Sequence, residues 1–188
     1  MKRTAGRNVT FAMLALALGS MLVSAGCKSS DAIASSSTRF TYAPAGGPSP
    51  SVTTALAAAS TASVAEIEIR ITDVLDVLSA SFSLDFDTAT VAFLDFDAAG
   101  SHLASDGTMI QPVVQLTQAD RLTVGITRLG ASGIDFNGSQ FLIKIRFLRV
   151  TSSGTSPLTF GNNELLDSMT PPQTIVGVQW FGGTFQVD

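Results

Sequence analysis

The segment Phe82-Ser83-Leu84-Asp85-Phe86-Asp87 has an apolar residue at every second position and a polar residue at each position between. This alternation is typical of a β-strand that buries one face and exposes the other. The same period of two runs through residues 66–72, 121–127 and 141–147. Turns rich in glycine, proline and asparagine separate such segments. Many short strands with regular turn signals, and no helical period, predict an all-β protein built as a sandwich or jelly roll.

The apolar positions of these segments define the expected core. They are Phe82, Leu84, Phe86, Leu122, Val124, Ile126, Ile143 and Ile145. We expect these side chains to meet between two stacked layers and to leave a smooth outer surface free. Residues 40–42 can form a short first strand. Prolines and glycines between residues 44 and 50 then break regular structure, and the Ala-rich residues 56–59 predict a loop that crosses the domain.

The first 26 residues have the organisation of a secretory signal peptide. Lys2, Arg3 and Arg7 form a positive start, and an apolar stretch follows at residues 9–23. This stretch is shorter than the roughly 20 residues that a membrane-spanning helix needs. The segment Val23-Ser24-Ala25-Gly26-Cys27 resembles the lipobox of bacterial lipoproteins, although Ser24 stands where the lipobox usually has Leu. In that family the cysteine receives a diacylglyceryl group and becomes the acylated N-terminus after cleavage.

Cys27 is the only cysteine in the chain, so it cannot form an internal disulfide. Lipidation explains its presence; the alternative is a free thiol beside an ordinary cleavage site. Acyl chains on Cys27 would anchor the protein to a membrane. Lys28 follows, where enterobacterial lipoproteins retained in the inner membrane have Asp. We therefore expect an exported protein, lipid-anchored to the cell envelope at the outer membrane or the cell surface.

Beyond the signal peptide (1–26), residues 27–37 are rich in Ser and Ala and predict a flexible tether. Residues 38–188 are long enough for one domain with its own core. Removing the three basic residues of the leader leaves 8 basic and 15 acidic residues, a formal charge of −7. Because nucleic-acid binding needs clustered Lys and Arg, this balance argues against a nucleic-acid partner.

The order of the expected strands and their local sequences resemble those of a cohesin module. The residues that carry the resemblance are Phe40–Tyr42, Glu66–Thr72, Phe82–Asp87, Val91–Leu94, Arg121–Thr127, Phe141–Phe147, Ser156–Gly161 and Gly182–Val187. The segment Ser156-Pro157-Leu158-Thr159-Phe160-Gly161 is the most specific of them. Thr88 departs from the family, which commonly has Pro there, and the stretch between the first two strands is long. The resemblance implies a nine-stranded β-sandwich with jelly-roll topology over residues 38–188.

The resemblance also implies a protein that binds without catalysing a reaction. Cohesins hold dockerins, small calcium-loaded modules on partner enzymes, against a flat sheet formed by their third, fifth, sixth and eighth strands. The corresponding outer face here includes Ser83, Asp85, Thr123, Gly125 and Thr127. Short polar side chains can accept hydrogen bonds from a partner helix at little entropic cost, but they equally suit a solvated face without a partner. The calcium would belong to the dockerin, since this chain has no EF-hand loop, and we expect no cofactor and no metal.

Two other kinds of chemistry are disfavoured. His102 is the only histidine and has no nucleophile motif beside it, which argues against an enzyme. The segments Asp85-Phe86-Asp87 and Asp95-Phe96-Asp97 each place two carboxylates on one face, roughly 7 Å apart by strand geometry. Such pairs could supply oxygen ligands for calcium, but a structural role at the sheet surface is favoured.

Carbohydrate binding is the main alternative, because related modules of this fold bind cellulose. Polysaccharide sites need exposed planar rings that stack on sugar faces. Trp180 is the single tryptophan and could supply one such ring, although packing at a sheet margin is favoured for it. A third possibility is a structural or adhesive envelope lipoprotein that uses the domain as a rigid spacer.

Overall fold

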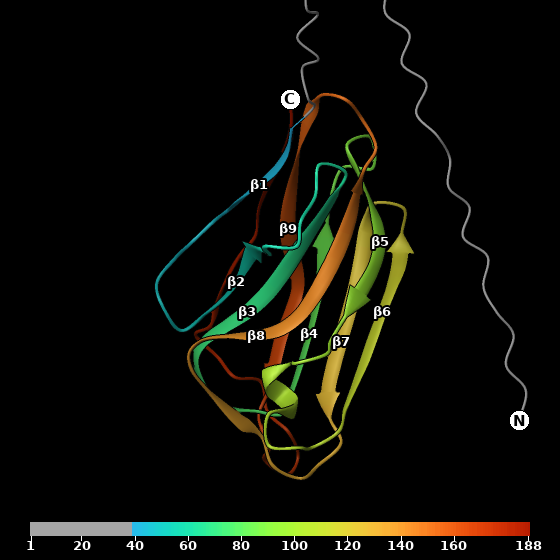
Figure 1. Cartoon of the computed structure of the whole chain (residues 1–188). Helices are drawn as coiled ribbons and strands as arrows, with labels where there is room; N and C mark the ends of the chain where they lie inside the picture. The colour runs from blue at the N-terminus through green and yellow to red at the C-terminus, as the bar shows by residue number, and fades with distance from the viewer. Residues whose placement is uncertain (1–38) are drawn as a thin grey trace, which may run out of the picture. The chain divides into compact units, whose positions relative to one another are not determined.

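A computed structural model describes residues 39–188 (Figure 1). This segment contains eleven strands and one short 3-10 helix, η1 (His102–Ala104), and it lies within one compact unit. No helix within residues 39–188 is long and apolar enough to cross a bilayer. The signal peptide at 1–26, Cys27 and the tether at 27–37 lie outside the described residues, so what was predicted for them stays a prediction.

The strands form two sheets that pack face to face (Figure 1). The six-stranded sheet has the order β1 (Phe40–Pro44), β11 (Gly183–Val187), β9 (Gly154–Leu166), β4 (Ser79–Asp85), β7 (Arg121–Arg128) and β6 (Ile110–Gln118). The five-stranded sheet has the order β10 (Gln179–Phe181), β2 (Ser51–Leu56), β3 (Val64–Val77), β8 (Ile134–Arg149) and β5 (Val91–Asp97). Neighbouring strands are antiparallel except β10 and β2, which are parallel. The predicted all-β sandwich is therefore confirmed.

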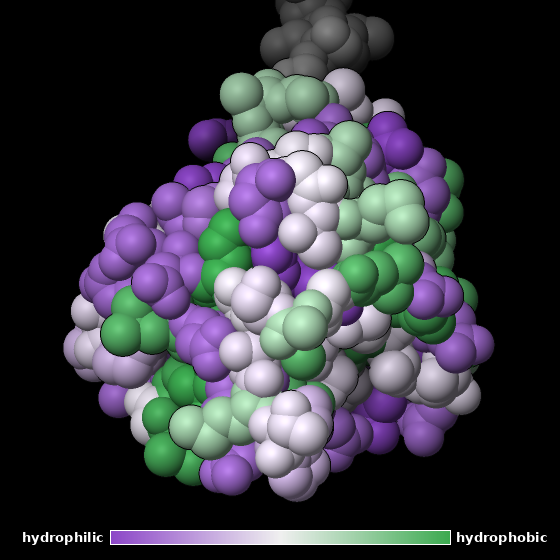
Figure 2. Space-filling view, turned by 90° about the horizontal axis from the view of Figure 1, so that it is seen from below, coloured by the Kyte–Doolittle hydropathy of each residue, from purple (hydrophilic) through white to green (hydrophobic). Residues whose placement is uncertain are grey.

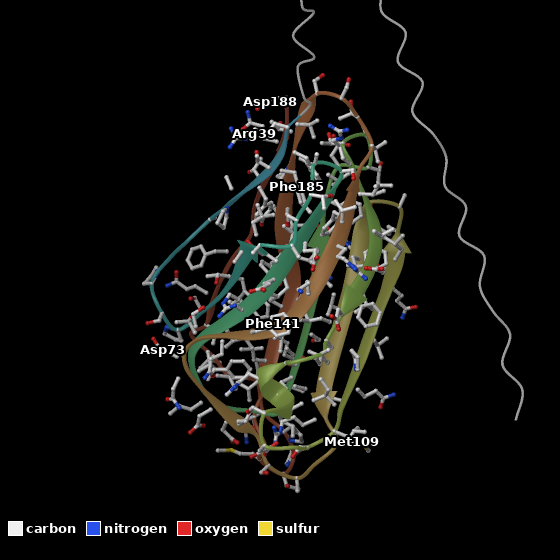
Figure 3. The ribbon with its side chains drawn as sticks, viewed as in Figure 1. Arg39, Asp73, Met109, Phe141, Phe185 and Asp188 are labelled. Atoms are coloured by element: carbon white, nitrogen blue, oxygen red, sulfur yellow. The ribbon has the colours of Figure 1, made fainter. Side chains whose placement is uncertain are left out.

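The core lies where the sequence pattern predicts it. All eight predicted core residues are buried, and Phe86 is the most exposed of them at 5%. Aromatic rings join the two layers: Phe147 of β8 packs 5.2 Å from Phe86 and 5.1 Å from Phe185 of β11, measured between ring centroids. Figure 3 shows side chains from both sheets filling the space between the layers.

The number of strands differs from the nine that the resemblance implies. Residues 51–56, which follow the predicted break at residues 44–50, form β2 and pair with β3. Val52 and Thr54 of β2 are buried, and β-branched residues of this kind suit a pleated, half-buried surface. The proline-rich break thus divides the N-terminal stretch between the two sheets: β1 joins the six-stranded sheet and β2 the five-stranded one. Two other strands also have no counterpart among the predicted segments: β6, and the three-residue β10, which pairs with β2.

A buried guanidinium fixes the connection between β5 and β6. The side chain of Arg128 is 1% exposed and donates to the carbonyl oxygens of Leu103 and Ser132 and to Asp106, whose Oδ2 lies 2.6 Å from Nη2. The hydrogen bond from Arg128 holds the pKa of the Asp106 carboxyl well below its usual range. These contacts attach η1 and the start of β6 to the end of β7.

Exposed apolar side chains are spread over the surface. Seen from below, the molecule shows apolar residues in several patches separated by polar ones (Figure 2). The most exposed large apolar residues in the described chain are Leu75, Met109, Met169 and Val176. All four lie outside or at the irregular parts of strands, and none lies on the outer surfaces of the central strands.

Candidate binding face

The outer surface of β4, β6, β7 and β9 carries mostly short side chains. Ser81 of β4 pairs with Gly125 of β7, and the pairs on either side follow the same alternation, opposite to core residues such as Phe82. The outward residues are Ser79, Ser81, Ser83, Asp85, Gln111, Val113, Gln115, Arg121, Thr123, Gly125, Thr127, Thr159, Gly161 and Glu164. We call this surface the hydroxyl face. All five residues that the sequence suggested for partner binding lie on it.

Three of these residues lie in a row along β7. Thr123 is exposed, and its Oγ1 lies 2.9 Å from Oγ1 of Thr117. Thr127 is half-buried, and its hydroxyl donates to the carbonyl oxygen of Arg128 at 3.3 Å. Gly125 lies between them, and a Cβ built on it would meet no atom within 4 Å. The space above Gly125 is therefore open to another molecule.

Gly125 forms the floor of a shallow hollow of about 370 Å³. Its walls come from β4, β6 and β7 and the end of β9: Ser79, Ala80, Ser81, Gln111, Val113, Ile126, Thr127 and Leu166. None of these residues is charged, and Val113 is 49% exposed. An uncharged side chain of a partner could enter this hollow without desolvating a charge on the protein.

Asp85 is bound to Arg121, a residue that the sequence reading did not include among the candidates. Nε of Arg121 lies 2.6 Å from Oδ1 of Asp85, and Nη2 lies 3.0 Å from Oδ2. The hydrogen bond with Asp85 raises the pKa of Arg121. Because both lie at the same register position of β4 and β7, the strand pairing brings them together. A partner would therefore meet a bidentate ion pair at this place and no free carboxylate.

Ser83 differs from the expectation of an exposed hydroxyl. It points outward, between Ser81 and Asp85, but it is only 2% exposed, and its Oγ has no hydrogen-bond partner among the described residues. Gly161 of β9 lies opposite Ser83 at a bulge, where Asn162 adopts a positive φ of 49°. A Cβ on Gly161 would come within 2.9 Å of Oγ of Ser83, so the neighbouring strand approaches closely here. Close packing at the centre of the sheet thus hides this hydroxyl.

The long stretch between the first two predicted strands does not cover the hydroxyl face. Residues 51–56 of that stretch are β2, a strand of the other sheet, and residues 57–63 connect β2 to β3. The hydroxyl face therefore stays accessible across β4, β6 and β7.

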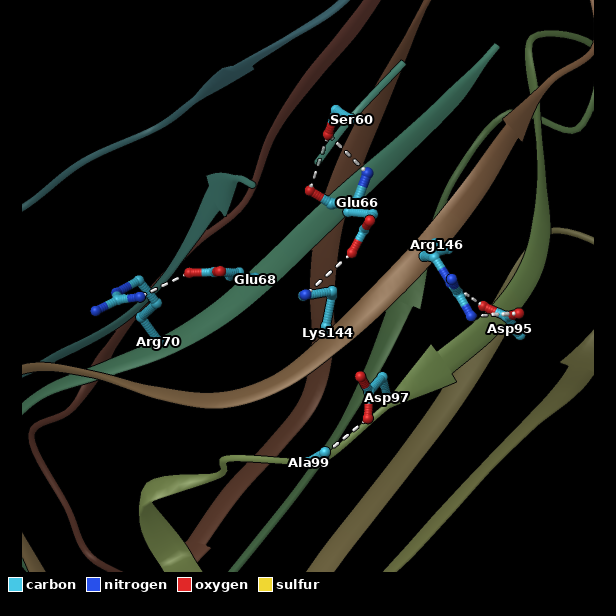
Figure 4. A network of polar contacts seen from close by, with 9 residues as sticks. All are labelled: Ser60, Glu66, Glu68, Arg70, Asp95, Asp97, Ala99, Lys144 and Arg146. Carbon is cyan, nitrogen blue, oxygen red and sulfur yellow. Dashed lines mark hydrogen bonds and ion pairs between the residues drawn. The ribbon is translucent and has the colours of Figure 1, made fainter. Parts of the chain in front are cut away.

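The outer surface of the five-stranded sheet has a different chemistry (Figure 4). Nζ of Lys144 lies 3.0 Å from Oε2 of Glu66, and Nη2 of Arg146 lies 2.7 Å from Oδ2 of Asp95. Nη1 of Arg70 lies 2.6 Å from Oε2 of Glu68. We call this surface the charged face. Its acidic and basic side chains pair with one another across β3, β8 and β5.

The two pairs of aspartates have partners within the protein. Asp85 and Asp95 bind arginines, as described above. Oδ1 of Asp87 accepts from the backbone N–H of Ala89 at 2.9 Å, and Oδ1 of Asp97 accepts from Ala99 at 2.8 Å. Within residues 39–188, no three Asp, Glu, His or Cys side chains are grouped so that they could hold a metal ion. These contacts fit a structural role for the four aspartates.

Trp180 packs between the sheets. Its ring centroid lies 5.6 Å from that of Phe82 and 5.2 Å from that of Phe160, and the side chain is half-buried. Such contacts hold the ring at the sheet margin, which disfavours its use as an open platform for a sugar. His102 packs against Phe136 with 4.8 Å between ring centroids, and its Nε2 lies 3.0 Å from the carbonyl oxygen of Asp135.

Comparison with solved structures identifies the fold. A type II cohesin domain from the cellulosome of Acetivibrio cellulolyticus matches with a TM-score of 0.56 and 14% identity, over 72% of this chain and 95% of that one. A chain of a type II cohesin–X-dockerin complex from the same organism has a TM-score of 0.53 and 10% identity, over 69% and 95%. The cohesin module of a family 33 glycoside hydrolase from Clostridium perfringens has a TM-score of 0.50 and 12% identity, over 74% and 99%.

No family model and no curated protein matches the sequence. At identities this low, the structural matches establish the architecture alone. The described domain has the fold of a cohesin module. In the strand order of this chain, the hydroxyl face belongs to β9, β4, β7 and β6, which are consecutive neighbours in the six-stranded sheet.

Proposed function

We propose that this domain is a non-catalytic binding module that holds a protein partner, a dockerin-type module, on the hydroxyl face. The observation that carries the proposal is the open, uncharged hollow over Gly125, which lies between β4, β7 and β6. The cohesin fold supports it, because one of the matching structures is a cohesin in complex with a dockerin.

The chemistry of the hydroxyl face suits a partner helix. Short side chains such as Thr123 and Thr127 lose little rotamer freedom when they are covered. A partner can insert an uncharged side chain over Gly125, while the Asp85–Arg121 ion pair offers directional hydrogen bonds at one end. Protein–protein interfaces usually combine uncharged, well-packed contacts with polar ones in this way.

The binding experiment compares one substitution on each face. Dockerin-bearing proteins encoded in the same genome are tested for binding to residues 39–188 and to the variants Gly125→Arg and Ala55→Arg. Arginine at 125 fills the hollow and buries a charge, so we expect at least about a tenfold loss of affinity. Ala55 lies on the outer surface of β2 opposite Glu68, where arginine is tolerated and binding is expected to stay unchanged.

A partner that binds all three proteins equally would refute the proposed face. Retention of the domain on a polysaccharide, lost in Trp180→Ala, would support carbohydrate binding in its place. If the domain binds neither a dockerin-bearing protein nor a polysaccharide, a role as a rigid spacer would be favoured.

We also propose that the module is displayed from the cell envelope by a lipid anchor on Cys27, with residues 27–37 as the tether. Supporting this are the charged start, short apolar stretch and lipobox-like ending of the leader. The native chain is expected to incorporate labelled palmitate and to fractionate with membranes, and Cys27→Ser to do neither. Equal labelling of both chains would contradict the anchor.

A further inference from the structure

Four strands form the open edges of the two sheets, and they are protected to different degrees. β10 has only three residues. β1 has five residues and ends at Pro44. β5 has seven residues, interrupted by a register shift between Phe93 and Asp95, and carries Asp95 and Asp97. Short length, bulges and charges are the features that stop an edge strand from pairing with another chain.

β6 is the exception. It spans nine residues, Ile110–Gln118, and none of them is charged. It is regular from Ile110 to Leu116, and its one register shift comes after Leu116. Pro112 is the only protective feature within that regular part. The longest edge strand in the described domain thus carries no charge, and β1 and β10, which also lack charged residues, are shorter.

The hydrogen-bonding groups of β6 that face away from β7 can be assigned. The backbone N–H of Leu129 donates to the carbonyl oxygen of Met109, so Met109 directs its peptide groups toward β7. In an antiparallel pair this direction alternates, so Gln111, Val113 and Gln115 also face β7. The peptide groups of Ile110, Val114 and Leu116 then face the open edge, as does the carbonyl oxygen of Pro112. Pro112 lacks only an outward N–H, so the β6–β7 ladder is unaffected.

We propose that β6 pairs with β6 of a second copy of this chain, antiparallel and centred on Val114. Val114 then exchanges two hydrogen bonds with its counterpart, and Pro112 lies opposite Leu116, whose N–H can donate to the Pro112 carbonyl oxygen. In this register odd-numbered residues face odd-numbered ones and even-numbered residues face even-numbered ones. The outward side chains of the two copies therefore lie on the same surface of the joined sheet, and so do the inward ones. The acidic chain, with a formal charge of −7 beyond the leader, meets no charged side chain of its copy along this strand.

The pairing has a closed symmetry. Antiparallel pairing of identical edges creates a two-fold axis perpendicular to the sheet, so assembly stops at a dimer. The same axis leaves both hydroxyl faces on one side of the joined sheet. This last consequence rests on the proposed function: a dimer would present two partner sites together and would gain avidity toward a partner with two modules.

The test measures mass and backbone exchange without any partner, so its outcome is independent of dockerin binding. Light scattering is applied to residues 39–188 from about 1 µM to about 1 mM, the range of weak and moderate affinities. We expect the mass to double as concentration rises. Hydrogen exchange should slow at Val114 and Leu116 in the dimer, whereas Val113, which bonds to β7, should be protected at every concentration.

The decisive variant is Val113→Lys/Gln115→Lys, since both side chains are exposed and each lysine would face a lysine of the second copy. We expect the dissociation constant to rise at least tenfold. The control Thr41→Lys/Ala43→Lys adds the same charge to β1, the opposite edge of the same sheet, and should leave the dimer intact. A monomer throughout, a dimer that survives the first variant, or one that dissociates equally in the control would overturn the proposal.

Discussion

The two sheets of this sandwich carry different residue types on their outer surfaces. On the charged face, acidic and basic side chains lie side by side on β3, β8 and β5 and pair with one another. On the hydroxyl face, the outward residues of β4 and β7 are serine, threonine and glycine, with the single Asp85–Arg121 pair at one end. Both sheets contribute apolar side chains to the core between them.

On the charged face the charged side chains are already paired with one another, whereas most of the hydroxyl face carries no charge to pair. A partner on the charged face would have to desolvate several ion pairs, which is costly unless each is replaced. A partner on the hydroxyl face meets short side chains and an uncharged hollow at Gly125. A partner would therefore cover the sheet that is poorer in charge at a smaller cost in desolvation.

The largest expected effect concerns the core that both faces share. Phe82 of β4 is 1% exposed and contacts the rings of Phe160 and Trp180. Phe82→Ala removes these contacts and leaves a cavity, so the free energy of unfolding should fall by about 3–5 kcal/mol. Urea denaturation measures this change. A loss below about 1 kcal/mol would mean that the two layers are not packed as described.

The next effect concerns the link between the two sheets. The hydroxyl oxygen of Tyr42 in β1 lies 2.6 Å from Oγ1 of Thr54 in β2. The Thr54 hydroxyl donates to the carbonyl oxygen of Gly182 at 2.7 Å. The Tyr42 hydroxyl therefore donates to Thr54. Burial raises the pKa of Tyr42 to about 12.

Because the unfolded tyrosine ionises near pH 10, the contribution of Tyr42 is present below about pH 10 and is lost as the pH rises toward about 12. The expected loss is about 2–3 kcal/mol in the free energy of unfolding. Denaturation curves over this pH range should show a smaller alkaline loss for Tyr42→Phe. Equal loss in both proteins would argue against a buried Tyr42.

The smallest expected effect concerns the charged face. Lys144→Gln removes the partner of Glu66, but the pair is partly exposed, so the change in the free energy of unfolding should stay below about 1 kcal/mol. Partner binding should not change at all. A large loss of partner affinity in Lys144→Gln would mean that the partner binds the charged face, which would contradict the proposed docking surface.

Much of the fold was predictable because alternation ties residue type directly to the side of a strand. Phe82, Leu84 and Phe86 were assigned to the core from their spacing alone, and all three are buried. The strand at residues 51–56 was not predicted, since it follows a run of prolines and glycines and gains its stability from pairing with β3. Local patterns carry no information on such long-range pairing.

The candidate site was predictable only as a set of outward positions. Parity placed Thr123, Gly125 and Thr127 on one surface, and the structure agrees. Parity could not show that a bulge of β9 hides Ser83, or that Asp85 is held by Arg121, because both depend on the register between strands. The opposite charges at the ends of the two strands were the one available signal for the ion pair.

The most direct test of the proposed docking surface is a map of amide chemical shifts of residues 39–188 during titration with a dockerin-bearing protein from the same genome. We expect the largest shifts at Thr123, Gly125 and Thr127, and none beyond noise at Glu66, Glu68 and Arg70. Shifts centred on β3 and β8, with the β7 residues unaffected, would contradict it.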